Sequence, residues 1–105
     1  MPNYVPGTGN SDATIMFVGE APGRIEDFNG IPFSGDSGEL LWEIWRELGH
    51  ERGEVYTTNV YKYRPPDNKI YRIEELCNKE ESISQLRDEI STINPHVIDA
   101  LGGTP

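Results

Sequence analysis

The sequence has little of what secreted, membrane or nucleic-acid-coating proteins need. One cysteine, Cys77, excludes a disulfide within the chain and favours a reducing compartment. No apolar run approaches the roughly 18 residues of a membrane span, and no basic-then-apolar leader opens the sequence. Nine basic residues stand against eighteen acidic ones, a net charge of −9, which disfavours binding of nucleic acid by charge alone. We therefore expect a soluble, cytoplasmic protein that does not bind membranes.

What is present predicts one small α/β domain over the 105 residues. A continuous apolar run at 13–18 is typical of a strand buried on both faces of a parallel sheet. Segments 54–60 and 97–101 predict two further strands. The order β-α-β-α-β predicts a three-layer sandwich with a small parallel sheet.

Two amphipathic helices are predicted between these strands. The first follows Asp36 as N-cap, with Glu39 as its capping-box partner, and places Trp45 in the core and Trp42 at its flank. The second covers 73–93 and ends before Pro95. The remaining segments are predicted loops: a flexible arm at 1–12, and the stretches 20–35 and 61–72.

Polar groups follow the predicted strands at the edge where parallel sheets bind ligands. Gly19-Glu20 follows the first strand, Asn59 closes the second, and Gly102-Gly103 follows the third. Phe33 lies in a Gly- and Pro-rich loop just after the first. A carboxylate, an aromatic ring and an amide at one sheet edge suit a pocket for a planar polar base.

Each of these groups has a simpler interpretation. Glu20 could be solvated or could cap the backbone of Gly23, Phe33 could plug the core, and Asn59 could hold a loop. A generic nucleotide- or phosphate-binding α/β domain is therefore one alternative.

The motifs together resemble the uracil-DNA glycosylase superfamily, in particular its bacterial and archaeal family-four branch. They occur in the family's order over nearly the whole chain: Gly19–Gly23, Glu26-Asp27, Gly30–Gly35, Thr58–Val60, Arg64–Asn68 and Asn94–Thr104. The resemblance implies the glycosylase fold and, as partner, uracil-containing DNA, including single-stranded DNA.

The resemblance also implies a role for each matching residue. Glu20 would orient or activate water, Phe33 would stack on the flipped uracil, and Asn59 would read the edge of the base. Ala21, Pro22 and Gly23 would shape the loop beside the base. The stretch with Lys62, Arg64, Lys69 and Arg72 is the basic segment that could contact phosphates, and Lys62 and Arg64 are its predicted DNA contacts; the alternative is a solvated loop.

Two departures from the family pattern limit what is implied. Family members hold an iron–sulfur cluster on four cysteines, whereas here Tyr63 takes one such position and Cys77 another, so we predict no cofactor and no metal. The family's His-Pro-Ser loop, which contacts uracil and DNA, has no match before Pro105.

Two functions follow. The chain is an active uracil-DNA glycosylase or part of a longer protein that is one, with the rest of the pocket supplied by a missing C-terminal part. Alternatively, it is a non-catalytic module that binds DNA or a replication or repair protein, for example one appended to a phage-type DNA polymerase.

Overall fold

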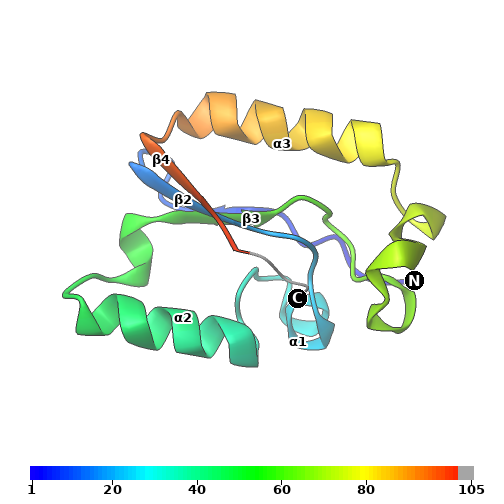
Figure 1. Cartoon of the computed structure of the whole chain (residues 1–105), viewed down its shortest axis with the longest axis horizontal. Coiled ribbons are helices and arrows are strands. Elements are labelled where there is room, and N and C mark those ends of the chain that lie inside the picture. The colour runs from blue at the N-terminus through cyan, green and yellow to red at the C-terminus, as the bar shows by residue number, and fades with distance from the viewer. Residues whose placement is uncertain (102–105) are drawn as a thin grey trace.

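The computed structural model describes residues 1–101, apart from the side chain of Ser37. One sheet in the order β1-β3-β2-β4 runs through the middle of the molecule (Figure 1). Its strands are β1 (Thr8–Gly9), β2 (Ile15–Gly19), β3 (Tyr56–Asn59) and β4 (Val97–Ala100). The strands β3, β2 and β4 are parallel, and β1 pairs antiparallel with β3. The α/β class is confirmed, with a mixed sheet that is mostly parallel.

Helices cover both faces of this sheet. Figure 1 shows α3 (Lys79–Ile93) on one face, with α1 (Arg24–Asn29) and α2 (Asp36–Glu47) on the other. Three short 3₁₀ segments connect these elements: Arg52–Glu54, Pro66–Asn68 and Ile70–Glu75. The arrangement has the three layers that the alternating sequence pattern predicts.

The core beneath α2 is built around Phe17, Trp42 and Val55. The Phe17 ring packs on both Trp42 and Trp45, with centroid separations of 5.9 and 5.5 Å. The prediction that Trp42 lies at the flank was wrong, because Trp42 is buried, whereas Trp45, predicted to lie in the core, is half-buried and packs against it. A buried indole needs a partner for its N–H, and Trp42 has one in the carbonyl of Phe33, at 2.9 Å.

The N-terminal segment is packed on the sheet, where a flexible arm was predicted. Val5 is fully buried, and its N–H donates to the carbonyl of Lys62 at 2.7 Å. Thr8 and Gly9 pair with Thr57 and Tyr56. So short a strand has no periodicity of its own, and its pairing depends on the exposed edge of β3.

The helix boundaries also differ from the prediction. Segment 20–35 contains α1, and Gly35 rather than Asp36 is the N-cap of α2. The predicted helix 73–93 is two elements, because Asn78 caps α3 by accepting a hydrogen bond from the Glu81 N–H at 2.9 Å. Asparagine is a strong N-cap, so it starts a new helix inside a continuous amphipathic pattern.

The far edge of the described sheet is open. The residues of β4 are all exposed, including Val97 at 54% and Ile98 at 44%. The predicted turn at 102–104 lies outside the described residues. Within 1–101, no helix combines the length and apolar character that crossing a bilayer requires.

Candidate functional site

A cavity of about 640 Å³ opens where β2 and β3 end. Its wall includes all the residues predicted to act in catalysis or substrate binding: Glu20, Ala21, Pro22, Gly23, Phe33 and Asn59. Parallel pairing brings them together, because Gly19 at the end of β2 lies opposite Asn59 at the end of β3. The acid, the ring and the amide therefore border one space, as the strand-end argument predicts. Their roles remain predictions.

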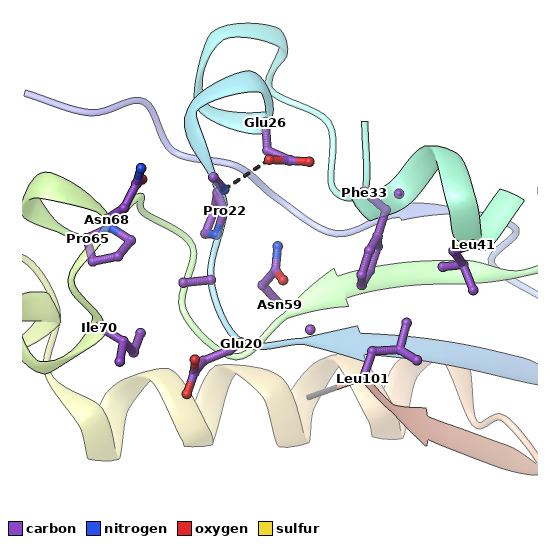
Figure 2. A pocket seen from close by; sticks show the side chains of 14 residues that line it. Glu20, Pro22, Glu26, Phe33, Leu41, Asn59, Pro65, Asn68, Ile70 and Leu101 are labelled. Carbon is purple, nitrogen blue, oxygen red and sulfur yellow. Dashed lines mark hydrogen bonds between the residues drawn. The ribbon is translucent and has the colours of Figure 1, made fainter. Parts of the chain in front are cut away.

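The ring and the amide form one part of this space. Figure 2 shows Phe33 and Asn59 projecting beside each other above the end of β2, with Pro22 across from the ring. The carboxylate of Glu20 projects from the other side of the strand end, toward Ile70. Burial, and then the charges of Glu74 and Glu20, raise the pKa of Tyr61, a phenol beside this part of the site.

Gly19 allows the ring and the amide to approach the end of β2. A Cβ at this position would lie 3.0 Å from Cζ of Phe33 and would overlap Oδ1 of Asn59. The sheet pairing continues past it, since the N–H of Val60 donates to the Gly19 carbonyl at 2.9 Å. The first glycine of the motif is thus required for close approach.

Glu26 joins the two glycine-rich loops of the site. One oxygen of its carboxylate accepts from the Gly23 N–H at 3.0 Å and the other from the Gly35 N–H at 2.6 Å. Gly23 is the N-cap of α1 and Gly35 the N-cap of α2. One side chain therefore satisfies an unpaired amide at the start of each helix and fixes the loops relative to each other. Glu26 therefore binds the backbone of Gly23.

Lys62 supports Asn59 from behind and is not placed for a phosphate contact. Its side chain is 4% exposed. Its ammonium donates to the Asn59 carbonyl, to Oγ1 of Thr58 at 2.8 Å and to Oε1 of Glu89 at 2.5 Å. A phosphate contact needs an accessible cation. The predicted DNA contact at Lys62 is therefore withdrawn.

The rest of the basic stretch is mostly paired with neighbouring side chains. Nε of Arg64 donates to Oδ1 of Asn68 at 2.7 Å, and its side chain remains half-exposed. Arg72 pairs with Asp67 and Glu75, both at 2.7 Å. Lys69 is exposed. Arg64 and Lys69 are thus better placed than Lys62 to meet a phosphate.

The described residues do not fit the iron–sulfur cluster that the resemblance implies. The ring of Tyr63 packs against Tyr4 with centroids 5.6 Å apart, in the place of one cysteine ligand. Burial raises the pKa of the Cys77 thiol, against the opposing effect of hydrogen bonds from the backbone of Tyr63 and Lys62. Within 1–101, no three His, Cys, Asp or Glu side chains gather as a metal site. We derive no step through a cluster.

Comparison with known proteins identifies the family. The model of the uracil DNA glycosylase superfamily matches residues 6–105. The chain belongs to this superfamily. It is 49% identical over 100 residues to a type-4 uracil-DNA glycosylase of Archaeoglobus fulgidus, covering 95% of the chain and 49% of that protein. A type-4 enzyme of Thermotoga maritima is 48% identical over 104 residues, or 97% of the chain and 52% of that protein.

A more distant relative is a polymerase. The DNA polymerase of Bacillus phage SP01 is 31% identical over 102 residues, which is 96% of the chain and 11% of the polymerase. The superfamily member described here thus spans about half the length of its type-4 relatives and a small part of this polymerase.

Several residues of the glycosylase-like site had no role in the sequence-based prediction. Glu26 and Asn68 were part of quoted motifs only, yet both line the cavity. Glu26 had a usable signal, because a Glu three residues after a helix N-cap can accept a hydrogen bond from the backbone N–H of the N-cap residue. Trp42 and Arg52, which contact the Phe33 loop, gave no such signal, since their partners are backbone carbonyls distant in sequence.

Proposed function

We propose that the cavity binds a uracil that has left the DNA stack, and that the chain provides this pocket for hydrolysis of the N-glycosidic bond of uracil in DNA. One observation carries the proposal: the ring of Phe33 and the carboxamide of Asn59 adjoin in a cavity whose wall also contains Glu20. Similarity to type-4 uracil-DNA glycosylases over 95% of the chain supports it.

The ring and the amide suit uracil among the pyrimidines. Stacking of a base on an aromatic side chain contributes about 1–3 kcal/mol, which offsets part of the cost of unstacking. The Asn59 amide can donate to O4 of uracil and accept from its N3–H. Cytosine presents an acceptor at N3 and a donor at N4, so the same amide orientation would leave both pairs mismatched.

Glu20 would act on the sugar and the water. In the hydrolysis, the bond between C1′ and N1 breaks, its electron pair leaves with uracil, and the oxygen of water bonds to C1′. The water proton is released to solvent or to the departing base. A carboxylate can orient that water and stabilise the positive charge that builds on the sugar. Glu20 lies apart from the ring and the amide, which is compatible with a division between base recognition by those two groups and catalysis by Glu20.

About half of each type-4 relative lies outside the match. We therefore include in the proposal a further segment that completes the wall of the pocket. We place that wall in a polypeptide segment that covers the exposed edge of β4. Arg64 and Lys69 are the proposed phosphate contacts. The net charge of −9 predicts that DNA binding by this chain is weak, and two phosphate contacts predict only a shallow decrease of affinity with salt.

A chimaera tests the catalytic part. Residues 1–101 of this chain would replace the matching part of the Thermotoga maritima relative, and uracil release from single-stranded DNA with one deoxyuridine would be measured. We expect release by the chimaera, loss of at least about a hundredfold on Glu20→Gln, and little change on Glu43→Gln, on the exposed surface of α2. A folded chimaera without release, or equal release by all three proteins, contradicts this proposal.

A binding experiment tests recognition in the chain itself. Free uracil and free cytosine would be titrated into labelled protein while backbone amides are followed by NMR. Uracil should shift Gly19, Gly23 and Asn59, and cytosine should do so much more weakly. Equal shifts with both bases would instead favour a generic nucleotide site.

A non-catalytic module is the second candidate, and the similarity to the phage DNA polymerase favours it. Such a module would bind DNA or a replication protein through the same fold without cleaving a bond. The module should bind DNA or a replication protein equally well with and without Glu20→Ala, and neither the unsubstituted chain nor the chimaera should release uracil. Release of uracil by the unsubstituted chimaera would favour the enzyme.

A further inference from the structure

The loop that carries Phe33 holds this residue in an unusual backbone conformation. Its φ is 56°, in the left-handed region that side chains other than Gly, Asn and Asp seldom adopt. Its ring nevertheless projects toward the end of β2, where Cζ lies against Gly19 (Figure 2). Such a conformation persists when surrounding contacts determine it.

Two side chains on the other side of the loop supply such contacts. Nε1 of Trp42 donates to the carbonyl of Phe33 at 2.9 Å, and Nη2 of Arg52 donates to the carbonyl of Pro32 at 2.7 Å. The guanidinium of Arg52 also lies over the Trp42 ring, 4.4 Å from its centroid. The carbonyls of two successive residues are therefore fixed by two groups that contact each other.

We propose that Trp42 and Arg52 are positioning residues for the ring of Phe33. The two carbonyls belong to the peptide planes before and after the Cα of Phe33. Fixing both planes fixes the backbone of Phe33, and this sets the direction in which the ring enters the cavity. Only the purpose of the ring, stacking on uracil, rests on the proposed function. The positioning of the ring is a property of the chain without ligand. Trp42 and Arg52 lie behind the loop and need not touch a bound base.

The chain contains a matched control in the same helix. Trp45 also packs on Phe17, and its Nε1 also donates to a backbone carbonyl, that of Glu51, at 2.9 Å. That carbonyl is on the connection after α2 and not on the Phe33 loop. Trp42→Phe and Trp45→Phe thus each remove one indole hydrogen bond and keep an aromatic ring, but only the first removes a bond to the loop.

The first measurement needs no ligand. In the wild-type chain, the Phe33 ring protons should give an NMR contact with the Hα protons of Gly19. This contact should persist in Trp45→Phe and weaken or vanish in Trp42→Phe and in Arg52→Met. Circular dichroism identifies any variant that fails to fold. If only one of Trp42→Phe and Arg52→Met folds, that variant is enough for the test. An unchanged contact in both, or equal loss in Trp45→Phe, overturns the proposal.

The second measurement connects positioning to the proposed stacking. Uracil and 5,6-dihydrouracil have the same polar edge, but the dihydro ring is not flat and stacks poorly. The preference for uracil over dihydrouracil should fall about fivefold or more in Trp42→Phe and should be unchanged in Trp45→Phe. A fivefold change corresponds to the lower end of the free energy of base–aromatic stacking. Absence of uracil binding by the wild type would contradict the proposed function, and the Phe33–Gly19 contact would still decide the positioning.

Discussion

The ammonium of Lys62 lies 2.5 Å from Oε1 of Glu89 and joins the loop after β3 to the C-terminal half of α3. Both groups are shielded from water, with side chains 4% and 17% exposed. Glu89 also accepts from Oγ1 of Thr58 at 3.0 Å and, through its other oxygen, from the hydroxyl of Tyr56 at 2.8 Å. This buried group connects two layers of the fold directly behind Asn59.

Loss of one partner of this pair should destabilise the chain. Lys62→Met leaves the Glu89 carboxylate without its cation, and breaking a buried pair in this way costs about 3–5 kcal/mol. We expect urea denaturation to show a lower free energy of unfolding, and Lys62→Met combined with Glu89→Leu to recover part of it. Glu75→Gln, which breaks the exposed Arg72 pair, is the control and should hardly move the midpoint. An unchanged midpoint in Lys62→Met would mean that the pair contributes nothing.

The hydroxyl of Tyr56 makes stability sensitive to alkaline pH. Burial, and then the bond to Glu89, raises the pKa of Tyr56 well above its usual 10.0. Below pH 10 the phenol is protonated in both states; above it the unfolded chain loses the proton first, so stability falls as pH rises toward the folded pKa. Tyr56→Phe should reduce this slope between pH 9 and 11, about one unit on either side of that value. Tyr71→Phe, which alters an exposed ring, should leave it intact.

Hydrophobic pattern was enough to predict the central strands and the sheet edge that holds the site. The run before Gly19 is apolar because β2 is covered on both faces, and Asn59 ends a strand that pairs with it. The family motifs then supplied candidate roles, which pattern alone leaves open.

The parts that were missed depend on partners distant in sequence. Helix α1 begins where Glu26 binds Gly23, but Glu26 is held in place by Gly35 as well. Lys62 was interpreted as a surface cation because lysine in a loop is usually exposed, and nothing near it in sequence indicates that Glu89 will meet it from α3. The positions of these residues are set by contacts between segments distant in sequence.

Gly38→Ala should destabilise the chain, although glycine-to-alanine substitutions normally stabilise helices. Alanine in place of glycine inside a helix usually gains about 1 kcal/mol. Here the new Cβ would overlap the backbone of Phe33, which cannot move without losing its bond to Trp42. We expect Gly38→Ala to lower the free energy of unfolding by roughly 1–3 kcal/mol. Gly53→Ala is the control, since nothing lies within 4 Å of a Cβ there. Greater stability of Gly38→Ala would show that the loop adapts freely.

Glu26→Gln should loosen the cavity without removing α1 or α2. An amide side chain keeps one acceptor oxygen but turns an NH₂ group toward the second backbone N–H, so either Gly23 or Gly35 loses its partner. An unsatisfied, partly buried N–H costs about 1–3 kcal/mol. Hydrogen exchange followed by NMR should show faster exchange at one of these two amides, while the amides of β2 keep their protection. Glu39→Gln, on the exposed surface of α2, provides the baseline. Unchanged exchange at both glycines would mean that the loops are held together by other contacts, and uracil affinity should then be unaffected as well.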